Sequence, residues 1–381
     1  MKDTKLIILA TLILVFVFIF NLNSIKADAK YKDAVLKKQI AQMILVGFNG
    51  QVLDSANPIY SQIKNLGIGG VILFSKNADV TQPKLVKNID NPKQVKKLIS
   101  DLQKISDTPL FVAVDQEGGR VSRLDPKVFE VSAFSAKELG GENDEKLTYN
   151  EALKTVKTLS GLGFNINFAP VVDLEINKNS QIISKLKRAY SEDPDIVVAH
   201  ARQVILAHDK YGVLPVIKHF PGHGSVEGDT HLGFVDATSV YSKNELLPYA
   251  FLIADPTATG VLVAHVFNSY LDPEFPASMS KKTVQDLLKT KLGFLGLVFT
   301  DDIQMKAIED NYTLEEALLN VINAGGDVIV IGNNLSYKPN VATEAVDIIF
   351  NLVKSGKVSQ ERIEESYEKI MRQKEKMKGK F

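Results

Sequence analysis

The sequence has no cysteine among its 381 residues and no excess of either charge. Without cysteine, the chain cannot form disulfides, thiolate metal sites, a cysteine nucleophile or a lipidated N-terminal cysteine. Its 45 basic residues are balanced by 45 acidic ones, so we expect no nucleic-acid partner, because proteins that bind nucleic acids usually carry a basic excess. The chain does have a hydrophobic fraction of 45%, which is enough to bury a sizeable core.

A long hydrophobic run stands at the N-terminus. Lys2 and Lys5 precede fifteen uncharged residues at 6–20, and a small-x-small triplet follows at 27–29. This order is typical of a secretory signal. The run is short for a spanning helix, which needs about 20 residues, and the alternatives are an uncleaved membrane anchor or a buried core helix. We exclude residues 1–29 from the fold and expect an exported protein, periplasmic or extracellular, that contacts the membrane only through this segment.

Beyond residue 30, short apolar runs rich in Val, Ile and Phe alternate with longer amphipathic segments. The short runs suit strands that are buried on both faces. We expect strands at 43–48, 70–74, 110–115, 165–170, 214–219, 260–265, 297–301 and 327–332. We expect helices at 93–105, 146–160, 195–211, 279–292, 314–324, 341–355 and 359–376. Asp193 before a proline marks one helix start, and Thr313 with Glu316 forms a capping box at another.

Eight strands alternating with helices, without a break in composition, predict an α/β fold with a single (β/α)8 barrel of the TIM type over residues 31–381. A doubly wound open sheet is the rival architecture. It would be favoured by a glycine-rich phosphate loop after the first strand, and the sequence GFNG at 47–50 is too sparse for one.

Polar residues follow or end five consecutive predicted strands. In barrels of this type, catalytic groups lie at the C-terminal ends of the strands. These polar residues are Asp115, Asp173, Lys218, His219, His265, Asp301 and Asp302. Any one of them could cap a helix or form a turn, but their accumulation at one pole predicts a functional site.

The segment KHFPGHGSVEGDTH, at 218–231, contains three of the six histidines. His219 and His223 are spaced like helical zinc ligands, but proline and glycine lie between them, and the glutamate of a zinc-protease motif is missing. We therefore expect no metal here. We expect His223 to bond to the backbone and shape the turn, whereas Lys218 and His219 place two donors at the barrel mouth.

Asp229 stands two residues before His231 in the same segment. A carboxylate at this spacing can accept from one ring nitrogen, which leaves the other nitrogen to exchange a proton with substrate. It also raises the pKa of the imidazole, as a general acid requires. The alternative is an Asx-type turn with an exposed histidine.

Asp301 and Asp302 are adjacent at the end of a predicted strand. Because side chains alternate along a strand, only one of them can point into the barrel mouth. The chain has no cysteine and no Gly-x-Ser-x-Gly elbow, so a carboxylate is the candidate nucleophile. Carboxylate nucleophiles suit glycosidic carbon.

Together these residues resemble glycoside hydrolase family three. The motifs DQEGGRVSR, FNINFAPVVD, KRAYSEDP, KHFPGHG with a downstream DTH, and VFTDDIQM occur in that family's order over nearly all of residues 35–375. More narrowly, the chain is similar to the family's single-domain bacterial β-N-acetylglucosaminidases of peptidoglycan turnover. The resemblance implies a retaining exo-enzyme that removes non-reducing terminal N-acetylglucosamine from peptidoglycan fragments, with no cofactor and no metal.

The resemblance also implies roles for individual residues. Asp301 would be the nucleophile that forms a covalent glycosyl-enzyme, and His231, paired with Asp229, would be the general acid/base. Asp302 would be an outward, structural partner. The residues implied to hold the sugar hydroxyls are Asp115, Arg123, Arg188, Lys218 and His219. Asp173 and His265 would be supports of lower rank.

Alternatives remain open at this point. A histidine acid/base puts one fewer anion in the site, so phosphate could replace water as the acceptor and give a phosphorylase-like side activity. A β-glucosidase or another exo-glycosidase is a second alternative. A non-catalytic wall-binding protein is a third, and it would be expected to have lost Asp301 or His231. The sequence leaves open whether the natural glycan is a muropeptide, a glycan strand or a chitin oligomer.

Overall fold

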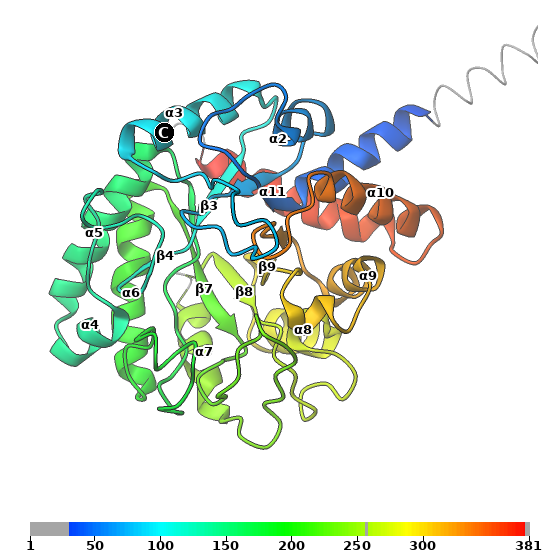
Figure 1. Ribbon diagram of the computed structural model, residues 1–381. Helices are drawn as coiled ribbons and strands as arrows, with labels where there is room; N and C mark the ends of the chain where they lie inside the picture. Colours follow the sequence, from blue (N-terminus) through cyan, green and yellow to red (C-terminus); the bar gives the residue numbers. More distant parts are fainter. Residues whose placement is uncertain (1–29, 256–257, 378–381) are drawn as a thin grey trace, which may run out of the picture.

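The computed structural model describes residues 30–255 and 258–377. In this part of the chain, eight strands form one sheet in the order β10-β1-β2-β3-β6-β7-β8-β9, and each neighbouring pair is parallel. The two edges also meet, because the backbone N–H of Thr300 donates to the carbonyl of Val328 at 3.0 Å. The sheet therefore closes into the predicted barrel, with helices around it (Figure 1).

The strands are short and entirely buried. They are β1 (Ile44–Gly47), β2 (Gly70–Ile72), β3 (Phe111–Val114), β6 (Ile166–Asn167), β7 (Leu214–Phe220), β8 (Gly260–Val263), β9 (Leu297–Thr300) and β10 (Ile329–Ile331). Each lies inside its predicted range except β7, which extends one residue further. A small antiparallel hairpin of β4 (Gln116–Gly118) and β5 (Val121–Ser122) follows β3 and was not predicted.

The helical layer also follows the prediction closely. The predicted helices correspond to α3 (Pro92–Ile105), α5 (Glu145–Leu162), α6 (Pro194–Tyr211), η4 (Lys282–Lys291), α9 (Leu314–Ala324), α10 (Val341–Lys354) and α11 (Gln360–Met377). The segment expected at 279–292 starts later and is a π-helix. Helical segments that were not predicted are residues 30–42, α2 (Pro58–Ser61), η1 (Gln62–Leu66), α4 (Ala136–Glu142), η2 (Lys243–Leu246), α7 (Leu247–Ala254), η3 (Ala277–Met279) and α8 (Lys306–Glu309).

The predicted helix starts are confirmed. The side chain of Asp193 accepts from the backbone of Asp195 at 2.9 Å, directly before the proline that begins α6. At the start of α9, Thr313 and Glu316 each accept from the other's backbone N–H, at 3.2 and 2.8 Å, which completes the capping box. These bonds satisfy N–H groups that a helix N-terminus otherwise leaves unpaired.

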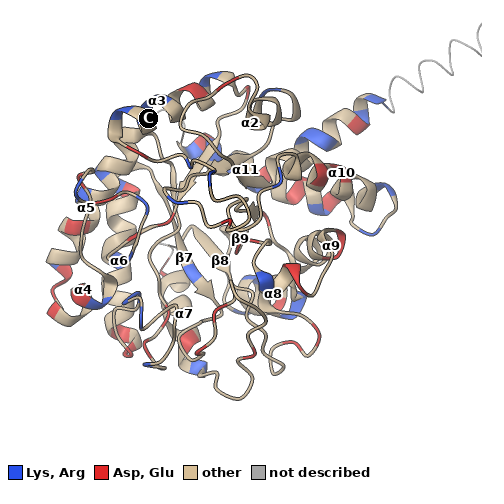
Figure 2. Cartoon of the chain, viewed as in Figure 1, with Lys and Arg blue, Asp and Glu red and all other residues tan. Residues whose placement is uncertain are grey.

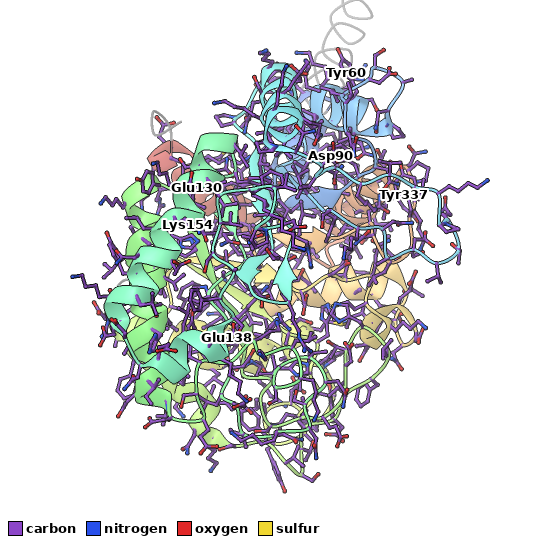
Figure 3. All side chains as sticks on the ribbon, turned by 60° about the vertical axis from the view of Figure 1, so that its left-hand side comes forward. Tyr60, Asp90, Glu130, Glu138, Lys154 and Tyr337 are labelled. Atoms are coloured by element: carbon purple, nitrogen blue, oxygen red, sulfur yellow. The ribbon has the colours of Figure 1, made fainter. Side chains whose placement is uncertain are left out.

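Acidic and basic side chains are interspersed over the outer helices (Figure 2). Glu138 on α4 and Lys154 on α5, for example, lie exposed on the outside of the helical layer (Figure 3). At the N-terminal ends of the strands, the buried Asp327 accepts from Arg362 of α11 at 2.7 Å and fastens that helix to the barrel.

No helix within residues 30–255 and 258–377 is long and apolar enough to cross a membrane. The predicted signal or anchor segment, residues 1–29, lies outside the described residues.

Candidate active site

The C-terminal ends of the strands surround a cavity of about 450 Å³. Its floor is apolar and includes Ile72, Phe168, Leu262 and Val330, whereas its walls are mostly polar. The cavity is lined by all eight residues predicted to act in catalysis or to hold the sugar: Asp115, Arg123, Arg188, Lys218, His219, Asp229, His231 and Asp301. Residues that are up to 186 positions apart in the sequence are thus brought to one pole of the barrel.

Asp301 lies just beyond β9, where its backbone N–H donates to the carbonyl of Val263 at 3.0 Å. Burial raises the pKa of the Asp301 carboxyl, and the protonated forms of the neighbouring imidazoles, led by His265 and His219, lower it by more. The net shift is below the ordinary value, so the group is a carboxylate at neutral pH. An ionised carboxylate at the cavity wall can attack an electrophilic carbon.

Asp302 turns toward the barrel wall, although it also borders the cavity. Its Oδ1 accepts from the backbone N–H of Gly332 at 2.8 Å and of Gln304 at 3.1 Å, which joins the end of β9 to the end of β10. Burial raises the pKa of Asp302 to about 6. The two adjacent acids therefore have different surroundings, as the alternation of side chains predicts.

His265 supports this corner from behind. Its Nε2–H donates to the carbonyl of Asp302 at 3.0 Å, and its Nδ1 accepts from the hydroxyl of Ser278 at 2.7 Å. Burial lowers the pKa of His265, so the ring is neutral near pH 7. The ring does not line the cavity. Because it binds the backbone next to Asp301, it helps to position that carboxylate.

Asp229 and His231 lie on the long loop between β7 and η2. Asp229 Oδ1 accepts from the backbone N–H of His231 at 2.8 Å and from its Nδ1–H at 2.7 Å. Nε2 is then the ring nitrogen left to meet a ligand. Burial lowers the pKa of His231, but the bond to Asp229 and the nearby charge of Asp301 outweigh it and raise that pKa. The side chain is still 49% exposed, so the proton can exchange with solvent or substrate.

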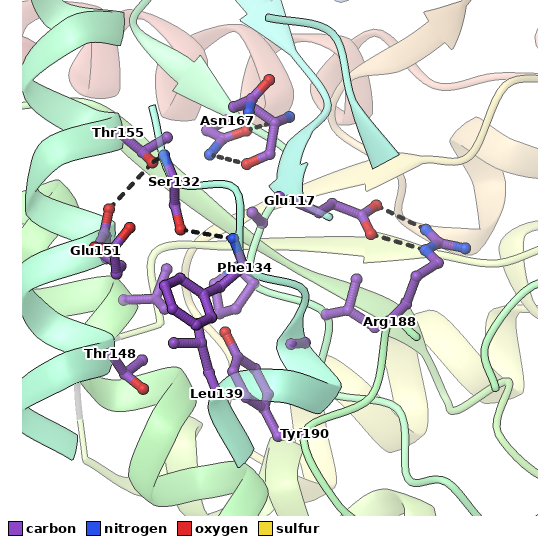
Figure 4. Close-up of a pocket in the computed structure, with 18 of the residues that line it drawn as sticks. Glu117, Ser132, Phe134, Leu139, Thr148, Glu151, Thr155, Asn167, Arg188 and Tyr190 are labelled. Atoms are coloured by element: carbon purple, nitrogen blue, oxygen red, sulfur yellow. Dashed lines mark hydrogen bonds and ion pairs between the residues drawn. The ribbon is translucent and has the colours of Figure 1, made fainter. Parts of the chain in front are cut away.

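Glu117 is a site residue that the sequence analysis missed. Its two oxygens accept from Nε and an NH2 group of Arg188, both at 2.7 Å (Figure 4). Burial raises the pKa of Glu117, and Arg188 and Lys218 lower it by more, to well below its ordinary value. Its position two residues after Asp115 was the available signal, because alternate residues of an extended segment lie on one side.

Lys218 joins the two acids of this segment. Its ammonium group lies 2.7 Å from both Asp115 and Glu117, and it is almost fully buried. Arg123 reaches Asp115 more loosely, at 3.6 Å, and stands over the ring of Phe74. The wall thus presents fixed charged groups with hydrogen-bonding capacity left for polar ligand atoms.

His219 is held between Asp173 and Arg188. Its Nδ1–H donates to Asp173 at 2.6 Å, while its Nε2 accepts from Arg188 at 3.0 Å. Asp173 is fully buried and does not line the cavity, so it orients His219. Both Lys218 and His219 reach the cavity although they are adjacent, because the pairing of β7 with β8 shifts register between Ile217 and Phe220.

The sequence predicts that His223 bonds to the backbone, but its ring makes no such hydrogen bond in the described part of the chain. The backbone N–H of His223, and not its ring, makes the local bond, donating to Asp173 at 2.8 Å. Both ring nitrogens are buried without a hydrogen-bond partner among the described residues. Burial lowers the pKa of His223 to about 4, so the ring is neutral where it borders the cavity.

The surroundings of the cavity include a second, smaller cavity but no metal-binding cluster among the described residues. Within the described residues, no group of three or more His, Asp or Glu side chains is arranged to hold a metal ion. A second cavity, of about 40 Å³, lies behind the Glu117–Arg188 pair and is lined by residues such as Ser132, Thr148 and Tyr190 (Figure 4). It is too small for a sugar. The cavity of about 450 Å³ is the candidate active site because the predicted site residues line it.

The arrangement provides two kinds of chemistry in one cavity. Asp301 offers an ionised carboxylate from the end of β9, and the Asp229–His231 pair offers a proton from the facing loop. The charge of Asp301 reaches His231 strongly enough to raise its pKa. A nucleophile and a proton donor set around one cavity suit the cleavage of a carbon–oxygen bond.

Comparisons with known proteins agree with this geometry. The sequence matches the glycosyl hydrolase family 3 N-terminal domain over residues 35–373. It is 30% identical over 340 residues to beta-hexosaminidase A from Pseudoalteromonas piscicida, covering 83% of this chain and 54% of that protein. It is 34% identical over 300 residues to beta-hexosaminidase LpqI from Mycobacterium tuberculosis, covering 77% of this chain and 72% of that protein.

A solved structure is also similar. It is a glycoside hydrolase family 3 beta-N-acetylglucosaminidase from Paenibacillus sp., with a TM-score of 0.80 and 30% identity, covering 90% of this chain and 62% of that chain. The present chain spans about half the length of the Pseudoalteromonas relative.

Proposed function

Because the chain belongs to glycosyl hydrolase family 3, we propose that it is a retaining exo-β-N-acetylglucosaminidase that releases the non-reducing terminal sugar. The observation that carries this proposal is the common cavity of Asp301 and the Asp229–His231 pair. The names of the relatives, which are beta-hexosaminidases and a beta-N-acetylglucosaminidase, support the choice of an N-acetylated sugar.

The proposed reaction has two steps. In the first, a carboxylate oxygen of Asp301 bonds to the anomeric carbon while the glycosidic bond breaks, and His231 gives its Nε2 proton to the departing oxygen. In the second, His231 takes a proton from water as the water oxygen bonds to the anomeric carbon and displaces Asp301. Two inversions leave the configuration of the sugar unchanged.

Asp229 serves both steps through its hydrogen bond to Nδ1 of His231. The bond fixes the ring so that Nε2 carries the exchangeable proton. The negative charge stabilises the imidazolium form before the first proton transfer and after the second. A histidine therefore takes the place that a second carboxylate usually has in retaining glycosidases.

The charged wall suits the binding of a terminal sugar. Asp115, Glu117, Arg188 and Lys218 form one connected set of ion pairs at the cavity wall. Sugar hydroxyls can both donate and accept, so they can bridge such paired acids and bases without leaving a charge uncompensated. This set is the proposed binding site for the hydroxyls, together with Arg123 and His219.

The direct test is hydrolysis of a chromogenic aryl β-N-acetylglucosaminide compared with the matching β-glucoside. We expect the N-acetylated substrate to be cleaved with much the higher kcat/KM. Equal cleavage, or a preference for the glucoside, would support the alternative exo-glycosidase. Cleavage of neither, with sugar binding retained, would support the non-catalytic wall-binding protein.

The same assay tests the acceptor. A histidine acid/base removes one negative charge from beside the anomeric carbon, which favours the approach of phosphate. A rate that rises with phosphate, and a sugar 1-phosphate product, would establish phosphorolysis. A rate independent of phosphate would restrict the enzyme to water.

The natural substrate that we propose is a peptidoglycan fragment, with export through the N-terminal segment. The basic start, the apolar run and the triplet at 27–29 support export. An exported enzyme of this specificity would meet cell-wall glycan, whose sugars include N-acetylglucosamine.

A further inference from the structure

The loop that carries Asp229 and His231 is fastened at its root by a buried carboxylate. Glu245 Oε2 accepts from the backbone N–H of Gly224 at 2.6 Å, and its Oε1 accepts from the backbone N–H of Ser225 at 3.0 Å. The hydroxyl of Ser225 also donates to Oε1. Three hydrogen bonds from two consecutive residues therefore converge on this one side chain, just where the loop leaves β7.

Glu245 occupies this place at an energetic disadvantage. The residue is 1% exposed, and no lysine or arginine of the described part of the chain pairs with its carboxyl. Burial and the charge of Asp173 raise the pKa of Glu245 to about 7, against the opposing effect of the three hydrogen bonds. A buried acid without a cation is destabilising unless its bonds compensate. The three hydrogen bonds to the loop are therefore the main contribution of Glu245 at this position.

The chain around Glu245 is shaped to admit it. Gly222 has a φ of +126°, and a Cβ built there would lie 2.5 Å from Cβ of Glu245. Only glycine allows this approach without a shift. Tyr241 adds a second link, since its hydroxyl donates to the carbonyl of Pro221 at 2.8 Å. Residues 241–245 thus clamp residues 221–225.

The tip of the loop has far less to hold it. The backbone N–H of Ala307 donates to the carbonyl of Thr230 at 3.2 Å. Beyond His231, the side chain of Leu232 is 74% exposed. That of Phe234 is 51% exposed, and its ring lies 5.3 Å from the ring of Phe267. The carbonyl of Val235 also accepts from the backbone N–H of Phe267 at 2.9 Å, so His231 lies between two anchored parts of the loop. Its direction therefore depends on how the root is held.

We propose that Glu245 is a positioning residue for the acid/base step. It holds the root of the loop so that Nε2 of His231 meets the glycosidic oxygen. This inference rests on the proposed function, because it assumes that His231 protonates the leaving group. Glu245 does not line the cavity, so its effect on catalysis acts through the loop.

Substrates with different leaving groups distinguish a positioning role of Glu245 from a purely structural one. A sugar or alkyl alcohol departs as a strong base and needs the proton from His231, whereas dinitrophenolate departs without it. In Glu245→Gln, one acceptor oxygen becomes an NH2 group that cannot accept from the loop backbone. We expect kcat/KM to fall about 10-fold or more for a β-linked N-acetylglucosamine disaccharide and by less than about threefold for the dinitrophenyl glycoside.

The experiment compares both substrates with the wild-type enzyme, Glu245→Gln and a matched control. The control is Asp327→Asn, which alters a buried carboxylate at the opposite end of the barrel. It is expected to lower the melting temperature but to leave the ratio of the two kcat/KM values unchanged. Ser225→Ala removes one of the three bonds and keeps Glu245, so it provides the test if Glu245→Gln does not fold. We expect it to shift the ratio in the same direction by a smaller factor.

Each outcome has one meaning. A ratio that changes in Glu245→Gln or Ser225→Ala, and not in Asp327→Asn, supports the positioning role. Equal losses on both substrates in the loop variants would overturn it and leave Glu245 a structural residue. Failure of the wild-type enzyme to cleave either substrate would instead overturn the proposed function.

Discussion

Asp229 accepts two hydrogen bonds from His231 on one carboxylate oxygen, through the backbone N–H and Nδ1. The pair is therefore rigid within itself, even though half of the His231 side chain is exposed. The proposed reaction depends on the proton affinity of His231. His231 must hold a proton before bond cleavage, and Asp229 is the main group that raises its pKa against the effect of burial.

Replacing Asp229 by alanine should change both the rate and its pH dependence. Without Asp229, the pKa of His231 is lower than in the wild-type enzyme. The ring therefore loses its proton at a lower pH. We expect kcat/KM to fall roughly 100-fold and its alkaline limb to move to lower pH. The measurement is the pH profile of kcat/KM for an aryl β-N-acetylglucosaminide.

Asp236 is a suitable control because it is an exposed acid on the same loop. Among the described residues, its carboxylate accepts only from the backbone N–H of Thr238. Asp236→Ala should keep the alkaline limb of the wild-type enzyme. An unchanged profile in Asp229→Ala would show that Asp229 does not govern the protonation of His231.

Candidate residues that stand out by type and place could be predicted from the sequence, whereas residues that contribute through contacts with distant partners were harder to predict. Asp301 and His231 could be recognised because they stand at strand and loop ends in distinctive motifs. Glu117 was missed and Asp173 was ranked only as a support, because their importance lies in contacts with Arg188 and His219 that span 71 and 46 positions. Such contacts depend on the closed barrel, which a local pattern does not specify.

Strands were predictable because burial on both faces makes each a short continuous apolar run, and long helices were predictable because burial of one face gives a helical period. The strands of the barrel are apolar on both faces, and α3, α6 and α9 start at cap residues visible in the sequence. The hairpin of β4 and β5 escaped prediction because it is short and rich in polar and glycine residues. Helix α7 escaped because LPYAFLIA is too apolar to give a polar face.

The capping box of α9 gives a prediction that concerns an element and not the site. Thr313→Ala removes the hydroxyl that accepts from the backbone of Glu316. We expect the free energy of unfolding to fall by about 1 kcal/mol, measured by urea denaturation, with kcat/KM unchanged. A large loss of activity at unchanged stability would contradict the assignment of α9 to the supporting layer.

At the scale of the whole molecule, the barrel separates stability from chemistry. Charged groups at the C-terminal ends of the strands surround the cavity, whereas the buried pair of Asp327 and Arg362 fastens α11 at the other end. Acidic and basic residues are mixed over the outer helices in the view of Figure 2.

The proposed export can be tested on the full chain. We expect enzyme activity from the complete sequence to appear outside the cytoplasm, in the soluble or the membrane fraction, after expression in a bacterial host. A variant lacking residues 1–29 should stay in the cytoplasm with the same kcat/KM, because none of the described site residues lies in that segment. Cytoplasmic activity from the full chain would contradict export.

The most direct measurement of the central claim is to trap the glycosyl-enzyme. A fluorinated N-acetylglucosaminyl fluoride slows both steps by withdrawing electrons, and its fluoride departs with little help from an acid. After digestion and mass spectrometry, the account predicts one added sugar on the peptide that contains Asp301, and none in Asp301→Asn. A sugar attached to another residue, or rapid turnover with no adduct and inverted product, would contradict it.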